Sequence, residues 1–155
     1  MAEDPEIKFN RLSITVHDFE DAIALLGEAG KFAEDVLAHE ALLTCALICF
    51  CRPFTVNEKD RDAKASAKME IGEFTDITAE EKKLHGDCMK IRNKAVAHAE
   101  WSHYPTKRSE ETNVVVSRRF SLIAVGIDWS ALARLLEKLR EQSHLKRADY
   151  LRRKS

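Results

Sequence analysis

The residues best suited to chemistry lie in one stretch, LHGDCMKIRNKAVAHAEW, residues 84–101. It contains Arg92 and His98. Arginine binds phosphate oxygens through two parallel hydrogen bonds, and histidine takes up and releases protons near neutral pH. RNA cleavage without a metal needs a base for the 2′-hydroxyl and a cation for the charge that develops on the phosphate. The stretch supplies both groups.

The surroundings of this pair are basic and aromatic. Residues 90–108 carry five bases and one acid. Lys94 adds positive charge, and Trp101 and Tyr104 have flat rings on which bases can stack. We therefore expect Lys94, Trp101 and Tyr104 to bind substrate, although anchoring a dimer interface would use the two aromatic residues equally well.

The run RNKAVAHAE, residues 92–100, resembles the R-x(4–6)-H motif of the HEPN superfamily, in which Asn, Asp or His usually follows the arginine. It is similar to the variant found in bacterial abortive-infection-type HEPN proteins. HEPN proteins are small α-helical bundles, typically dimeric, and many are metal-independent endoribonucleases of toxin–antitoxin and phage-defence systems. The resemblance implies a catalytic pair of Arg92 and His98, with Asn93 as the supporting polar residue.

The same resemblance implies partners and an alternative function. The expected partners are a second copy of the chain, an RNA substrate, and a regulatory protein such as an antitoxin. No cofactor is expected. Because the superfamily also includes inactive members, the alternative is a catalytically silent HEPN-like module that binds a nucleotide, an RNA or a partner protein.

Each site residue also has an ordinary structural interpretation. Arg92 could pair with Asp87 or Glu100 at the surface, and His98 could be a half-buried, hydrogen-bonded residue beside the apolar seam. On an ideal helix of about 100° per residue, Arg92 and His98 flank that seam about 120° apart, and Asn93 points away from it. They would then meet only if the helix is distorted, or if the Arg92 flank of one chain approaches the His98 flank of another.

The cysteines predict packing rather than a metal site. Cys45, Cys49 and Cys51 lie in the apolar run Ala41–Cys51, and Cys88 lies in a second helical pattern. Cysteines in such surroundings are typical of the core of a protein in the reducing cytoplasm, and no accompanying ligand spacing indicates zinc. There is also no Gly-rich phosphate loop and no nucleophile elbow.

The elements that hold these residues are predicted to be helices. Apolar residues spaced by three and four over Val16–Leu26 predict a first helix that ends near residue 30. The run Ala41–Cys51 predicts a central buried helix that ends at Arg52, because Pro53 disfavours helical geometry in the residue before it. Residues 55–77 are expected to form a loop with a short helical turn.

The second half of the chain carries clearer boundary signals. Thr78 and Glu81 fit a capping box at the start of a third helix. The apolar stripe of this helix consists of Leu84, Cys88, Ile91 and Ala95. Residues 112–126 predict a strand or small hairpin, and Asp128 caps a last helix. The predicted fold is all-α: a HEPN-like four-helix bundle forming one domain over residues 1–155, with an N-terminal segment 1–15 and a basic C-terminal tail 140–155.

Composition agrees with this class. The 155 residues are 45% hydrophobic and 33% charged, with five Gly and three Pro, which excludes collagen-like and disordered chains. Residues 1–40 carry ten acids and three bases, whereas residues 134–155 carry eight bases and three acids. The basic end would suit either contact with RNA or a solvated helix face.

The acidic start is unlike a secretory signal, and the longest apolar run is shorter than the roughly 20 residues that span a bilayer. We therefore expect a cytoplasmic protein that is not in a membrane.

Overall fold

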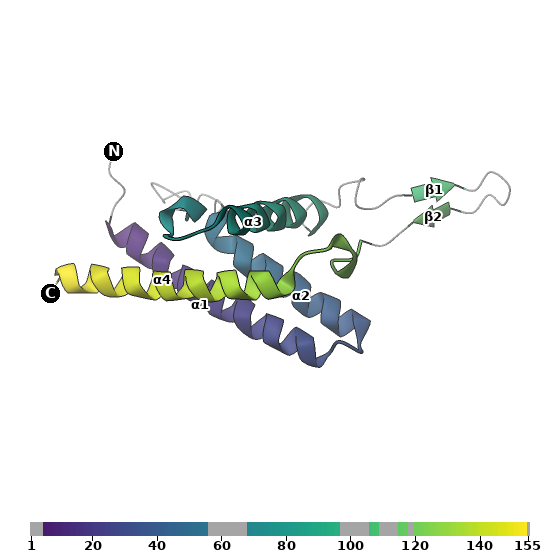
Figure 1. The fold of residues 1–155 in the computed structure, drawn as a ribbon, viewed down its shortest axis with the longest axis horizontal. Coiled ribbons are helices and arrows are strands. Elements are labelled where there is room, and N and C mark those ends of the chain that lie inside the picture. Colours follow the sequence, from purple (N-terminus) through teal and green to yellow (C-terminus); the bar gives the residue numbers. More distant parts are fainter. Residues whose placement is uncertain (1–4, 56–67, 97–105, 109–114, 118–119, 155) are drawn as a thin grey trace.

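The computed structural model describes residues 5–55, 68–96, 106–108, 115–117 and 120–154. Its main elements are the helices α1 (Pro5–Lys31), α2 (Val36–Cys51), α3 (Ala79–Ile91) and α4 (Trp129–Lys154). Two short strands, β1 (Thr106–Arg108) and β2 (Val115–Ser117), pair in antiparallel fashion between α3 and α4 (Figure 1). The all-α class with four main helices is confirmed for the described residues.

Shorter helical turns connect these elements. The 3-10 turns are η1 (Arg52–Phe54), η2 (Ile71–Glu73) and η5 (Ile123–Val125). Directly after α3 the chain continues as a π-helical segment, η3 (Arg92–Val96).

Helix α1 lies between α2 and α4 and makes most of its contacts with these two helices. The ring of Phe9 stacks on that of Tyr150 at 4.6 Å, and Glu20 Oε1 lies 3.3 Å from His144 Nε2. Since residues early in α1 meet residues late in α4, the two helices run antiparallel. Helix α3 contacts α2 and α4 more lightly, so more of its surface is left uncovered.

The core follows the predicted spacing. Phe19 of α1, Phe50 of α2 and Cys88 of α3 are completely buried. The buried face of α4 consists of Leu132, Leu135, Leu136 and Leu139. Each such apolar side chain contributes about 1.5–3 kcal/mol relative to exposure, so this shared core holds the four helices together.

Helix α2 is less buried than its composition predicts. Leu47 and Cys51 are buried, but Cys45 is exposed and Val36 and Leu37 are more than 60% exposed. The expectation that Cys45 is a core residue is wrong, because α2 packs by one face and Cys45 lies on the other. By length and composition, one described segment, Val36–Phe54, would be apolar enough to cross a membrane, a test that core helices of soluble proteins also pass.

Helix ends agree with the local signals. Thr78 Oγ1 accepts a hydrogen bond from the Glu81 N–H at 3.1 Å, and Glu81 Oε2 accepts one from the Thr78 N–H at 2.8 Å. These two bonds confirm the capping box of α3. Asp128 Oδ1 accepts the Ala131 N–H at 2.8 Å, which confirms the predicted cap of α4. Helix α2 ends at Cys51, directly before the turn that contains Pro53.

The two terminal segments are largely parts of the long helices α1 and α4. Helix α1 begins at Pro5, so most of the segment 1–15 is helical. Proline suits the first turn of a helix, since its missing N–H needs no partner there. Helix α4 extends to Lys154, so the basic tail 140–155 is the last half of a helix rather than a separate extension.

Candidate functional site

The helical geometry changes at Arg92. Its backbone N–H donates to the carbonyl oxygens of both Cys88 and Met89, and the π-helical segment Arg92–Val96 follows. Segments of this type are rare and occur frequently at functional sites. Angular positions taken from an ideal α-helix therefore do not apply to residues 92–96.

Arg92 is oriented by its neighbour. Arg92 Nη1 donates a hydrogen bond to Asn93 Oδ1 at 2.8 Å, and both side chains are half-buried. The direction expected for Asn93 was derived from a regular helical step, whereas Asn93 lies in the π-helical segment. The amide accepts from the guanidinium without neutralising its charge.

The predicted surface ion pair with Asp87 is absent. Asp87 Oδ2 lies 2.7 Å from Lys83 Nζ, and its other oxygen lies 3.8 Å from Lys90 Nζ. Within the described part of the chain, Arg92 forms no ion pair with a carboxylate. Its positive charge is therefore not cancelled by any described acidic residue.

Two buried thiols lie beneath this segment. Burial raises the pKa of Cys88 to about 12 and raises that of Cys51 still further, against the opposing effect of nearby Arg92 on Cys51. Since only a thiolate is a good nucleophile or metal ligand, both cysteines are inert core residues at neutral pH. Their role is to support the helix that carries Arg92.

Lys94 faces a different surface from Arg92. It is exposed and lines a groove of about 560 Å³ between α3 and the segment Val125–Asp128. Leu84 and Ile91 supply apolar contacts in this groove, and Arg92 is not among its lining residues. The structure thus brings Arg92 and Asn93 together and leaves Lys94 on a neighbouring surface.

The remaining predicted positions, His98, Trp101 and Tyr104, lie outside the described residues. So does Glu100, the other suggested partner of Arg92.

His85, which the spacing puts near the face of Arg92, is a half-buried residue packed against the core. Its ring packs edge-on against Phe54 with centroids 4.4 Å apart and against Phe50 at 5.9 Å. Burial lowers its pKa, and its buried Nε2 has no hydrogen-bond partner in the described residues. Burial therefore favours the neutral form of His85.

A second polar cluster was missed by sequence reasoning. Arg52 Nη1 donates to Asp18 Oδ1 at 3.1 Å, and Arg11 Nη2 donates to the Arg52 carbonyl oxygen at 2.6 Å. Asp18 is nearly buried, and burial is the main cause that raises its pKa. The available signal was the position of Arg11 and Asp18 seven residues apart on the core-facing side of α1. This cluster joins α1 to the end of α2.

No family model, no curated protein and no solved structure matches the chain. Nor does any group of three or more His, Cys, Asp or Glu side chains within the described ranges have an arrangement that would hold a metal ion.

Proposed function

We propose that the protein is a HEPN-like endoribonuclease of toxin or phage-defence type that works in the cytoplasm without a metal cofactor. The supporting observation is the Arg92–Asn93 pair in a π-helical segment: a guanidinium held by a neutral amide and not cancelled by any described carboxylate. The R-N-x(4)-H order of residues 92–98 adds the proton-transfer group that an arginine lacks.

The proposed reaction uses the RNA's own 2′-hydroxyl. Neutral His98 removes its proton, and the 2′-oxygen attacks the adjacent phosphorus. The bond to the 5′-oxygen breaks, and this oxygen takes up a proton from water. The products are a 2′,3′-cyclic phosphate and a 5′-hydroxyl end. Arg92 stabilises the charge on the equatorial oxygens, since its planar fork can contact two of them at once.

Asn93 has a positioning role in this scheme. Arginine has five N–H donors, and the bond to Asn93 Oδ1 engages one of them. The others remain for phosphate, from a guanidinium whose orientation is restricted before substrate arrives. Lys94, Trp101 and Tyr104 are proposed to bind the flanking nucleotides by charge and by stacking.

The proposed active form is a homodimer in which the 92–98 segments of two chains lie close together. Helix α3 makes the lightest helix–helix contacts in the bundle, and the groove beside it has an apolar floor that includes Leu84 and Ile91. A second chain packed here would cover that floor and bring a second Arg92 flank to the site. A regulatory protein such as an antitoxin is a further proposed partner.

The test compares cleavage of total RNA, in excess EDTA, by the wild-type protein, Arg92→Ala and Arg140→Ala. Arg140 is a matched control, because it is a half-exposed arginine paired with Glu137 on α4. The proposal predicts cleavage by the wild type and Arg140→Ala and none by Arg92→Ala. An intact protein that leaves RNA uncut but binds it through Arg92 would support the alternative, an inactive HEPN-like module.

A further inference from the structure

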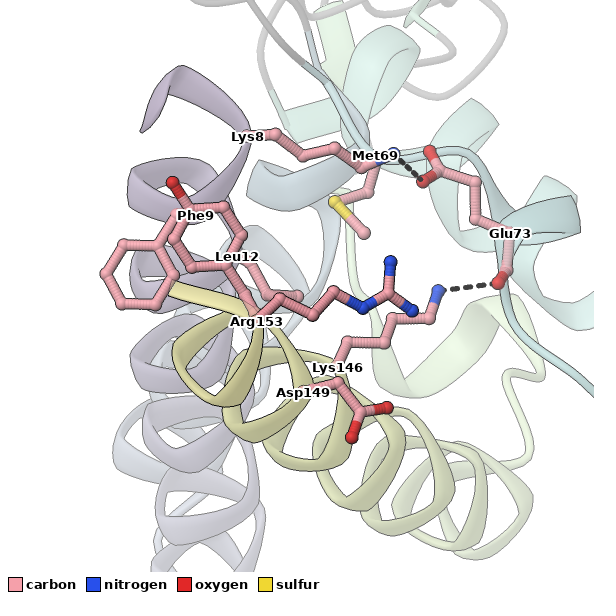
Figure 2. A pocket seen from close by; sticks show the side chains of 9 residues that line it. Lys8, Phe9, Leu12, Met69, Glu73, Lys146, Asp149 and Arg153 are labelled. Atoms are coloured by element: carbon pink, nitrogen blue, oxygen red, sulfur yellow. Dashed lines mark hydrogen bonds and ion pairs between the residues drawn. The ribbon is translucent and has the colours of Figure 1, made fainter. Parts of the chain in front are cut away.

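A cavity of about 360 Å³ lies between the beginning of α1, the last turns of α4 and residues 69–73 (Figure 2). It is at the end of the molecule opposite Arg92. Glu81 at the start of α3 bonds Lys138 of α4, whereas Ile91 at the end of α3 lies beside the segment that precedes α4. The two helices therefore run antiparallel, and the last turns of α4 lie far from the proposed RNA site (Figure 1).

The interior of the cavity is apolar. Leu12 and Met69 are buried at its floor, and Phe9, stacked on Tyr150, forms one wall. A volume of this size is within the roughly 300–1,000 Å³ typical of small-molecule sites, which combine apolar walls with a few polar groups.

The carboxylates around the cavity already have cationic partners outside it or at its rim. Glu73 Oε2 lies 3.7 Å from Lys8 Nζ, and Glu73 Oε1 accepts the backbone N–H of Glu70 at 2.9 Å. Asp149 Oδ1 lies 3.5 Å from Arg152 Nη1. Each of the two lining carboxylates therefore has a cationic partner within 4 Å.

Two cations line the cavity without forming an ion pair with a carboxylate among the described residues. Lys146 Nζ donates to the Glu73 carbonyl oxygen at 2.5 Å and lies 4.5 Å from the centre of the Phe74 ring. The guanidinium of Arg153 points toward the middle of the cavity and forms no hydrogen bond or ion pair within the described residues (Figure 2). Burial lowers the pKa of Lys146, against the opposing effect of the nearby Glu73 carboxylate.

We propose that this cavity binds a small aromatic phosphate monoester, with its phosphate on Arg153 and Lys146 and its ring against Leu12, Met69 and Phe9. A phosphate monoester carries close to two negative charges near neutral pH, which matches two cations that form no ion pair with a described carboxylate. The arginine fork fits two phosphate oxygens, and the lysine supplies a point charge. A carboxylate or phosphodiester carries one charge and would leave one cation uncompensated.

The test is calorimetric titration of the full chain with phenyl phosphate, and with phenol, phenylacetate and inorganic phosphate as partial ligands. We expect phenyl phosphate to bind with a dissociation constant below about 1 mM, given its small number of atoms. Each partial ligand should bind at least about tenfold more weakly, since it lacks the charge or the ring. Absence of binding at several millimolar phenyl phosphate, or equal binding of inorganic phosphate, would overturn the proposal.

Two variants on α4 distinguish binding in the cavity from a general effect of charge. Arg153→Gln should weaken binding by about tenfold or more, because a charge-assisted two-point contact is lost. Arg140→Gln removes the same charge from a side chain that pairs with Glu137, and neither residue lines the cavity, so binding should change by less than twofold. Equal weakening by both variants would contradict a defined site. Lys146→Gln is the second variant that should weaken binding.

The methionine methyl groups can show where on the protein the ligand binds. The chain has three methionines, and Met69 lies at the cavity while Met89 lies on α3. With ¹³C-methyl methionine, phenyl phosphate should shift the Met69 signal, assigned through Met69→Leu, and leave the Met89 signal in place. Binding that moves Met89 and not Met69 would show a different site and overturn the proposal.

Discussion

Two arginines in this protein bind partners of different charge: one binds a carboxylate and the other binds a neutral amide. Arg52 donates to the nearly buried carboxylate of Asp18, across the interface of α1 and the end of α2. Arg92 donates to the neutral amide of its neighbour Asn93, at the end of the lightly packed α3. A carboxylate cancels the charge of its arginine and joins two helices, whereas an amide orients the arginine and leaves its charge available. By this comparison Arg52 is structural, and Arg92 has the features of a binding group.

The largest expected effect is on activity at Arg92. Arg92→Lys keeps the charge but loses the planar fork, so RNA cleavage should fall by about 100-fold or more, the usual effect of losing a transition-state donor. The free energy of unfolding should change by less than about 0.5 kcal/mol, as for other half-exposed positions. Cleavage rates and urea unfolding of the same preparation check both statements. A lysine variant with nearly full activity would place Arg92 among ordinary surface charges.

The opposite behaviour is expected at Asp18. Asp18→Ala leaves Arg11 and Arg52 without their acidic partner and should lower the free energy of unfolding by about 1–2 kcal/mol. The effect is moderate because Arg52 is half-exposed and because burial already disfavours the ionised form of Asp18. Asp21→Ala, an exposed acid on the same helix, is the control and should change stability little. Loss of RNA cleavage in a folded Asp18→Ala protein would remove the distinction between the two sites.

The cysteines test how far packing supports the Arg92 segment. Cys88→Ser places a hydroxyl in a completely buried position one helical turn before Arg92 and should cost about 1–3 kcal/mol. Cys45→Ser, on the exposed face of α2, should cost less than about 0.5 kcal/mol. Chemical denaturation of both variants measures the difference. Equal costs would mean that Cys45 is packed after all.

The smallest expected effect is the pH dependence caused by His85. Burial lowers its pKa below the ordinary 6.5, so the unfolded chain binds a proton at a higher pH than the folded chain does. The contribution of His85 to stability is therefore constant above about pH 6.5 and decreases as the pH falls from there toward the folded pKa. Urea titrations from pH 8 to pH 5 should show a steeper loss in the wild type than in His85→Gln. Parallel curves would contradict the buried, neutral histidine.

Sequence predicted the features that depend on neighbouring residues. Thr78 with Glu81, Pro53 and Asp128 act within a few positions, and each marks the helix end that the structure has. Contacts between residues far apart in the sequence could not be predicted from it. Which face of the apolar helix α2 is covered depends on α1, so Cys45 was assigned to the core although it is exposed.

Only part of the candidate site could be predicted, because its geometry also depends on structure that neighbouring residue types do not show. The residue types at Arg92 and Asn93 were noted, but their hydrogen bond follows from a π-helical segment that an ideal helix cannot represent. The cluster of Arg11, Asp18 and Arg52 joins residues 34 and 41 positions apart and has no short-range pattern.

The central claim is that Arg92 serves metal-free cleavage of RNA by its own 2′-hydroxyl. Its most direct test is analysis of the ends produced from a short RNA in excess EDTA, beside the same RNA with a 2′-O-methyl group at the cut position. The account predicts a 2′,3′-cyclic phosphate and a 5′-hydroxyl from the first RNA, and no cut at the blocked position of the second. A 5′-phosphate product, cleavage of the blocked RNA, or activity that needs added magnesium would contradict it.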